Sequence, residues 1–255
     1  MKILSTLLYA IAILFTLNAC GVKDYKSSSK PISHEIWDSL LQKYVTNEGH
    51  VDYQGFIQDS VLFERYITLL ENNHPNKSNW TKAEQLAYWI NAYNAFTVKL
   101  IVDHYPVKSI KDIKNGIPFV NTVWDIKFID IEGATYDLNN IEHGIIRKKF
   151  DEPRIHFAVN CASISCPRLR NEAFMPDKLD NQLEDNARYF LANPAKNDFS
   201  DPTHLKLSKI LKWYGSDFKG KKYGGVRGLI KKYGPAHNDD AEIEYLDYDW
   251  NLNEK

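Results

Sequence analysis

The sequence predicts a single α+β domain in which helices predominate, with a buried central helix and a small, mainly antiparallel sheet. Residues 86–102 are apolar on nearly every side of a helix, a pattern typical of a helix at the centre of a domain. Elsewhere, short segments of alternating polarity indicate strands, and these interleave with helices without the regular rhythm of a βαβ fold. The 255 residues show no internal repeat.

The helices of the first half carry clear local signals. A helix is predicted over residues 36–44, because four apolar side chains recur there at helical spacing. A second helix is predicted over residues 59–72. The central helix begins at a capping box formed by Thr81 and Glu84, and Pro106 ends it.

Two amide side chains, Asn91 and Asn94, lie three residues apart on one face of the central helix. A buried amide without a hydrogen-bond partner costs about 1–3 kcal/mol. These side chains are therefore expected either to brace the backbone or to belong to a functional site.

The second half of the chain combines helices with short strands. Alternation over residues 123–128 and a turn signal at Gly133 predict a hairpin that returns over residues 134–136. Asp137 or Asn139 then caps a helix that runs to about residue 149. The remaining predicted elements are a strand over 154–160, helices over 179–192, 208–214 and 225–233, and a final strand over 242–248.

The N-terminus predicts a lipoprotein signal. An uncharged apolar run over residues 3–17 follows Lys2; it has the length of a signal h-region and is short for a membrane span. The run ends in Leu-Asn-Ala-Cys at residues 17–20, which resembles a bacterial lipobox. The resemblance implies that residues 1–19 are removed and that Cys20 is lipidated. A secretory signal with an incidental cysteine and an uncleaved anchor are the alternatives.

Residues 20–32 are polar and Ser-rich and predict a flexible tether, which leaves residues 33–255 as the globular domain. Lipidation of Cys20 would make the membrane a partner and would place the protein in the bacterial cell envelope, on the periplasmic face or the outer membrane. The 32 basic and 33 acidic residues nearly balance, which argues against a nucleic-acid partner. No cofactor and no metal are predicted.

Four motifs resemble the domain-of-unknown-function family 547 (DUF547) and follow the order of that family. The resemblance covers nearly all of the chain after the tether. The motifs are YWINAYNA at 88–95, IEHGIIR at 141–147, HFAVNCASISCP at 156–167 and YDWNLN at 248–253. The family implies no established activity, so the functional hypotheses come from the residues themselves.

Cys161 is the first candidate for chemistry, because it ends a predicted strand and opens a Ser-rich loop. A catalytic thiol needs a base or cation beside it and donors for an oxyanion. His143 lies on the preceding helix, which is expected to pack against that strand. Asn91 or Asn94 would orient this histidine or donate to the oxyanion. The hypothesis is a thiol-dependent hydrolase or acyltransferase acting on a peptide or amide.

Three further residues are candidates to support this site. Arg147 follows His143 by four positions and shares its helix face. Glu142 is expected to point elsewhere unless the helix opens there, because neighbouring residues of an α-helix differ by about 100°. His156 is an alternative neighbour, either packed or supporting. A histidine that precedes the cysteine in the chain departs from the order of papain-like and transglutaminase-like enzymes.

The competing hypothesis is a non-enzymatic binding or structural module of the envelope. In an oxidising compartment, Cys161 and Cys166 would form a disulfide. A reversible disulfide would reconcile both hypotheses. A zinc site of these cysteines with His143 and His156 suits the donor preference of zinc but matches no standard spacing.

Other conspicuous residues favour loops or packing. The basic, glycine-rich segment 219–228 lacks the Walker pattern and predicts a mobile loop before a helix. Four tryptophans are predicted to pack in the core or at its edge rather than to form a carbohydrate platform: Trp80, Trp89, Trp124 and Trp213.

Overall fold

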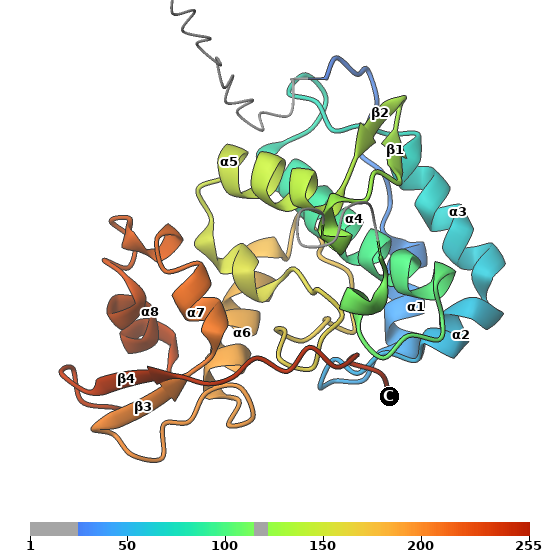
Figure 1. The fold of residues 1–255 in the computed structure, drawn as a ribbon. Helices are drawn as coiled ribbons and strands as arrows, with labels where there is room; N and C mark the ends of the chain where they lie inside the picture. Colours follow the sequence, from blue (N-terminus) through green and yellow to red (C-terminus); the bar gives the residue numbers. More distant parts are fainter. Residues whose placement is uncertain (1–24, 115–121) are drawn as a thin grey trace, which may run out of the picture.

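The computed structural model describes residues 25–114 and 122–255, which form an α+β fold rich in helix, as predicted (Figure 1). The predicted helices over 36–44 and 59–72 are confirmed. The helices of the first half are α1 (Glu35–Tyr44), α2 (Tyr53–Gln58), α3 (Ser60–Glu71) and α4 (Lys82–Asp103), followed by the 3-10 turn η1 (Ile110–Asp112).

The buried central helix is α4. Its capping box is present: the Glu84 N–H donates to Thr81 Oγ1 at 3.2 Å, and the Thr81 N–H donates to Glu84 Oε2 at 2.7 Å. Nearly every side chain from Leu86 to Ile101 is buried, whichever side of the helix it occupies. The all-round apolar pattern therefore identified the helix at the centre of the main hydrophobic core.

The first strand of the predicted hairpin lies later in the chain than predicted, whereas the second strand lies where it was predicted. β1 (Ile129–Ile131) pairs antiparallel with β2 (Ala134–Tyr136) across a two-residue turn in which Glu132 and Gly133 both have positive φ. The predicted strand over 123–128 is wrong, because its start is the 3-10 turn η2 (Val123–Asp125). The Asp125 carboxylate accepts from both the N–H and the hydroxyl of Thr122, and these local bonds close a turn instead.

The predicted helix up to residue 149 is present as the π-helix η3 (Asn140–Ile146) followed by α5 (Arg147–Lys149). Asp137 caps it, accepting from the Asn140 N–H at 2.6 Å. The predicted strand over 154–160 is wrong: its first part is the 3-10 helix η4 (Pro153–Phe157). Consecutive side chains there are all buried, so the alternation did not mark two faces of a sheet.

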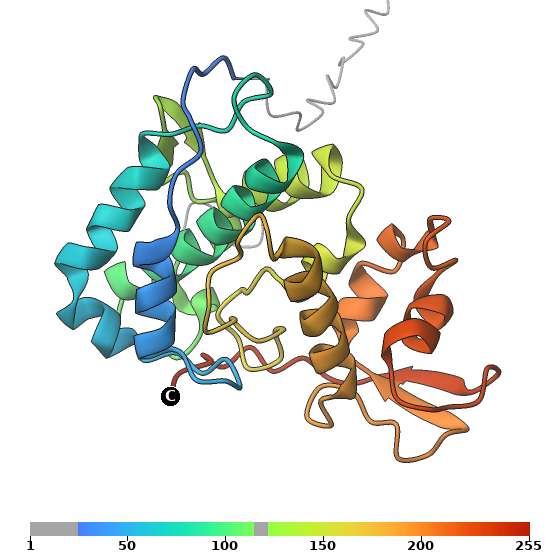
Figure 2. The ribbon, with the colours of Figure 1, turned by 180° about the vertical axis from the view of Figure 1, so that it is seen from behind.

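The C-terminal third is drawn in orange and red in Figures 1 and 2. Its helices agree with the predictions, but the final strand is shorter and pairs in parallel with a strand that the sequence did not indicate, giving a second two-stranded sheet. The elements are α6 (Leu179–Ala192), β3 (His204–Leu207), α7 (Lys209–Trp213), η5 (Asp217–Lys219), α8 (Val226–Tyr233) and β4 (Glu242–Tyr245).

The buried apolar side chains form two clusters. The larger cluster surrounds α4 and takes in α1, α2, α3, β1 and η3. The smaller cluster joins Phe157 to α6, α7, α8 and the β3–β4 sheet. The C-terminal tail leaves β4 and runs back to the larger cluster, where the Val51 N–H donates to Asn253 O at 2.9 Å (Figure 1). The tail therefore ties the two clusters together.

Residues 25–32, expected to belong to a flexible tether, lie against the domain. The Ser29 carbonyl accepts hydrogen bonds from three side chains, those of Asn76, Asn79 and Trp80, at 2.9–3.0 Å. The apolar run over 3–17 and Cys20 lie outside the described residues. Among the residues that are described, no helix is both long and apolar enough to cross a membrane.

Candidate functional site

A pocket of about 190 Å³ lies where the two clusters meet. It brings together Cys161 and His143, the pair that the sequence singled out, and adds Glu142 to them. On the side of the larger cluster it is lined by Tyr93, Trp124, Asn139, Glu142, His143 and Cys161. On the side of the smaller cluster and the tail it is lined by Ile210, Trp213, Tyr214, Tyr248 and Trp250.

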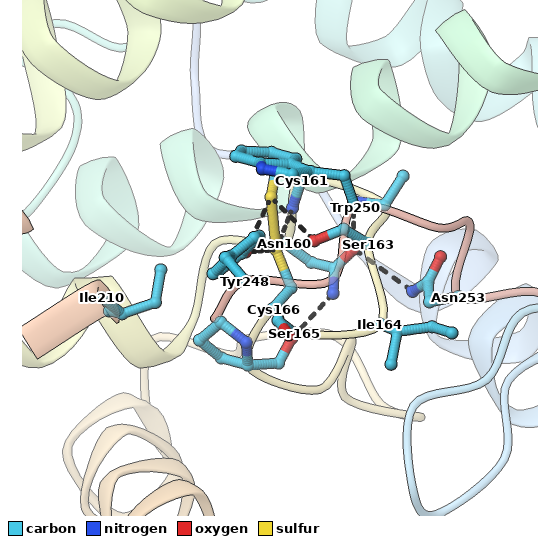
Figure 3. Close-up of a disulfide and its surroundings, with 12 residues drawn as sticks. Asn160, Cys161, Ser163, Ile164, Ser165, Cys166, Ile210, Tyr248, Trp250 and Asn253 are labelled. Carbon is cyan, nitrogen blue, oxygen red and sulfur yellow. Dashed lines mark hydrogen bonds between the residues drawn. A yellow bond between two sulfur atoms is a disulfide. The ribbon is translucent and has the colours of Figure 1, made fainter. Parts of the chain in front are cut away.

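Cys161 is joined to Cys166 by a disulfide (Figure 3). Cys161 is half-buried and Cys166 is buried. The Cys161 N–H donates to Cys166 Sγ at 3.0 Å, and the Tyr248 hydroxyl lies 3.4 Å from Cys161 Sγ and 3.2 Å from Cys166 Sγ. The structure therefore presents the oxidised form of the loop, with Cys161 on the pocket wall.

Hydrogen bonds from α4 hold the loop that carries Cys161 in place. Asn94 Nδ2 donates to Ala158 O, and the Asn160 N–H donates to Asn94 Oδ1, both at 2.9 Å. Asn160 Oδ1 in turn accepts from the N–H of Ala162, whose φ is +58°, a backbone conformation that a residue with a Cβ rarely adopts. The amide of Asn94 thus fixes the backbone on which the cysteine sits.

Asn91 likewise forms two hydrogen bonds with the backbone of another segment, at Phe174. Its amide donates to Phe174 O at 2.8 Å and accepts from the Phe174 N–H at 3.0 Å. Neither Asn91 nor Asn94 lines the pocket, and both ends of each amide are occupied by backbone. Their expected roles in orienting His143 or binding an oxyanion are not supported; of the two alternatives, they brace the backbone.

The C-terminal tail holds the other side of the loop. The Ile164 N–H donates to Asn251 O at 2.8 Å, and the Ser165 N–H donates to Asp249 O at 3.1 Å. This pairing places Tyr248 and Trp250 beside the disulfide (Figure 3). Both residues belong to the last of the four sequence motifs, which was the one signal that could have brought them into the site.

Glu142 and His143 lie on the π-helix, whose wider turn brings neighbouring side chains closer than an α-helix does. Glu142 Oε1 is 3.7 Å from His143 Nδ1, so the exception that the prediction allowed for an opened helix applies here. The predicted shared face with Arg147 is confirmed, because Arg147 Nη1 lies 3.0 Å from His143 Nδ1. His143 is exposed.

Arg147 connects this site to His156. Asp217 accepts two hydrogen bonds from Arg147, at 2.7 and 2.8 Å, and lies 2.8 Å from His156 Nε2. The bonds from His156 and then from Arg147 hold the pKa of Asp217 well below its usual range. Burial lowers the pKa of His156, and Asp217 opposes that shift. His156 stacks on Tyr214 at 3.8 Å and acts as a packed, supporting residue.

Glu142 is an acidic side chain enclosed by aromatic ones. Its side chain is 7% exposed, and Oε1 accepts no hydrogen bond from the described residues. Burial raises the pKa of both Tyr93 and Tyr214, and the negative charge of Glu142 raises it further. The two phenols therefore stay protonated beside this carboxylate.

Aromatic rings form one wall of the pocket. The rings of Tyr248 and Trp250 lie 4.5 Å apart, and that of Trp213 lies 4.8 Å from Tyr248. Trp80 and Trp89 are buried in the core as predicted, but Trp213 is 47% exposed and lines the pocket together with Trp124. The sequence did not indicate this gathering, because its members come from separate segments.

The described residues contain no group of three or more His, Cys, Asp or Glu side chains arranged to hold a metal ion. The cysteines and histidines considered for zinc are also committed to other partners: the sulfurs to each other, His143 to Arg147, and His156 to Asp217.

Comparison with known families gives a match over part of the chain. Residues 77–191 match the model of the family described as a protein of unknown function, DUF547. Three of the four motifs that carried the resemblance fall inside this range, whereas the tail motif at 248–253 lies beyond it. No curated protein and no solved structure matches the chain.

Proposed function

We propose that this is a lipid-anchored protein of the bacterial cell envelope, with a pocket that carries thiol-dependent acyl chemistry on a peptide or amide once Cys161 is reduced. The observation that supports the proposal is that Cys161 and His143 line one pocket, with the Glu142 carboxylate 3.7 Å from the histidine. A thiol, an imidazole and an orienting carboxylate are the groups that a cysteine hydrolase uses.

The chemistry would begin with reduction. An external dithiol supplies two electrons and two protons, and Cys161 and Cys166 become thiols. His143 Nε2 would take the proton from Cys161 while Nδ1 keeps its own proton toward Glu142. The thiolate would attack the carbonyl carbon, the histidine would return the proton to the leaving amine, and water would release the acyl group.

Arg147 sets a condition on this mechanism. Its guanidinium donates to His143 Nδ1, which assigns the imidazole proton to Nε2 and makes that nitrogen a donor instead of a base. The active form therefore requires Arg147 to release Nδ1. Because Asp217 holds the same guanidinium by two bonds, a small shift toward Asp217 is the movement expected.

The second candidate is a non-enzymatic envelope module that binds a ligand in the pocket. Two observations favour it: both sulfurs are committed to a disulfide, and the arginine occupies the nitrogen that would have to hold a proton. In this case the disulfide fixes the loop, and no thiol takes part.

Alkylation of the reduced protein separates the two candidates. For a nucleophile, Cys161 in Cys166→Ser reacts with iodoacetamide near neutral pH faster than a model thiol with a pKa of about 8.5. His143→Ala slows that reaction, and Cys161→Ser abolishes it. A structural disulfide predicts instead no free thiol in the native protein, ordinary labelling after reduction and equal loss of stability in either cysteine variant. That second pattern would remove the enzymatic proposal.

The envelope location is tested separately at Cys20. Each buried methylene of an acyl chain contributes about 0.8 kcal/mol to membrane binding, so Cys20→Ser is expected to release the protein into the soluble fraction. Wild-type protein should carry the lipid mass on the peptide that begins at Cys20. Equal membrane retention of both forms, with no added mass on the wild type, would contradict the anchor.

A further inference from the structure

We infer that the pocket beside Cys161 binds an ammonium group, such as that of an alkylamine or of a lysine side chain in a peptide. The inference names the ligand class of the pocket and rests on the proposed function only for what that amine does there, as leaving group or acyl acceptor. It is carried by the juxtaposition of the Glu142 carboxylate with the ring wall of Trp213, Tyr248 and Trp250.

The first step concerns charge. Glu142 is more than nine-tenths buried, and its Oε1 accepts no hydrogen bond from the residues described. A buried carboxylate is costly unless a cation or several donors balance it. The hydroxyls of Tyr93 and Tyr214 lie beside this carboxylate, but they are neutral. Arg147 is held by Asp217 through two bonds, and His143 Nδ1, which faces Arg147, lies 3.7 Å from Glu142 Oε1. Among the described residues, Glu142 is therefore left without a cation that pairs with it alone.

The second step concerns the rings. An ammonium is attracted to the face of an indole or phenol ring within about 6 Å, and the attraction grows when water is excluded. Two cations of this chain already lie over rings that line the pocket: Lys111 Nζ lies 3.8 Å from the ring centre of Trp250, and the Arg147 guanidinium lies 5.1 Å from that of Tyr214. The wall is thus chemically suited to a further cation.

The third step concerns size. A pocket of about 190 Å³ is smaller than the roughly 300–1,000 Å³ of sites that enclose a whole drug-sized ligand. It suits a head group or one side chain. A sugar could also stack on the tryptophans, but its hydroxyls are neutral and would leave the charge of Glu142 without a counter-ion. Charge, ring wall and volume together favour an alkylammonium.

The test uses the purified full-length protein with its disulfide intact, so that no thiol chemistry intervenes. The indole N–H signals of the tryptophans are followed by NMR during titration with n-butylammonium, and in parallel with n-butanol and methyl glucoside. We expect n-butylammonium to shift the signals of Trp213 and Trp250 in a saturable manner and to leave that of buried Trp37 unchanged. We expect n-butanol to bind about tenfold more weakly, because it carries no charge.

Two variants sharpen the test. Glu142→Gln keeps the volume and removes the charge, and should weaken n-butylammonium binding about tenfold or more. Trp213→Ala, at an exposed ring, should weaken it several-fold. Glu64→Gln is the matched control: this exposed carboxylate on α3 pairs with Lys99 and lies outside the pocket, so binding should not change.

Several outcomes would overturn the inference. They are equal binding of n-butanol and n-butylammonium, unchanged affinity in Glu142→Gln, shifts caused by methyl glucoside but not by the amine, and no shift with any probe. None of them bears on whether reduced Cys161 reacts with iodoacetamide. Conversely, an inert Cys161 leaves amine binding intact, so failure of the inference and failure of the proposed function are distinguishable.

Discussion

The interior of the larger hydrophobic cluster and its border with the smaller one differ in the polar groups that they hold. In the larger cluster, the amides of Asn91 and Asn94 are neutral, and backbone groups satisfy both ends of each. At the border with the smaller cluster, ionic groups are added: buried His156 and half-buried Arg147 meet at half-buried Asp217. The larger cluster thus has the features of a stable support, whereas its border with the smaller one holds the candidate pocket and the buried carboxylate of Glu142.

Exposure shows the same difference. The large side chains around α4 are almost all buried, but Trp213 of α7 is 47% exposed beside the pocket. Residues that mainly stabilise a fold are expected to be enclosed, and exposed rings beside a pocket point to binding. The comparison predicts that stability and ligand binding can be changed separately, and four experiments test this.

The largest effect is expected at the centre of the larger cluster. Ile90→Asp buries an uncompensated charge and should lower the free energy of unfolding by about 5 kcal/mol or more, most of what a domain has. Chemical denaturation of Val61→Asp serves as the control, because Val61 on α3 is 79% exposed and should change little. A melting temperature near that of the wild type for Ile90→Asp would show that α4 is not central to stability.

The second-largest effect on stability is expected at the hydrogen bonds of Asn94 and Asn91 with the backbone. Asn94→Ala leaves the Asn160 N–H and the Ala158 carbonyl without partners and should cost about 4 kcal/mol, at roughly 2 kcal/mol for each buried group. Asn91→Ala should cost a similar amount at Phe174. Only Asn94→Ala should also change the alkylation rate of reduced Cys161. If both variants changed the alkylation rate equally, the hydrogen bonds of Asn94 would have no specific effect on the loop that carries Cys161.

A fall in pH should lower the free energy of unfolding through protonation of His34, which lies beside the larger cluster. Burial lowers the pKa of His34 to about 4, and its Nδ1 lies 2.8 Å from the Tyr66 hydroxyl. The unfolded chain takes up this proton near pH 6.5, so the stabilisation is present above pH 6.5 and is lost as the pH falls toward 4. The loss amounts to about 3 kcal/mol.

Denaturation curves at pH 7 and pH 4.5 should therefore differ less for His34→Asn than for the wild type. His156→Asn should have a smaller effect on the pH dependence, because Asp217 opposes the lowering of the pKa of His156. A greater change for His156→Asn would reverse the proposed difference between the clusters.

The smallest effect on stability is expected at the pocket wall. Trp213→Ala should lower the free energy of unfolding by less than about 1 kcal/mol, because nearly half of the side chain is already in water. Trp89→Ala, at a ring that is 3% exposed, should cost about 3–5 kcal/mol by calorimetry. Equal losses for the two variants would mean that Trp213 is part of the core.

Local signals account for what the sequence predicted well. The capping box at Thr81, the apolar side chains over 86–102 and the predicted helix over 179–192, which matches α6, depend on residues a few positions apart. The strand predicted over 154–160 failed for the converse reason. Its alternation matched a strand, but burial on all sides and the cap at Glu152 produced a 3-10 helix.

The sequence by itself determined the central helix and the helical character of the domain, and it singled out Cys161 and His143 as candidates, because each of these rests on residue type and short-range spacing. Only the tertiary structure decided which groups meet them. The pocket takes Glu142 from an opened helix, Trp213 from α7 and Trp250 from the tail. Local sequence patterns do not indicate such contacts, because the contacts form only when the two clusters pack together and the C-terminal tail crosses between them.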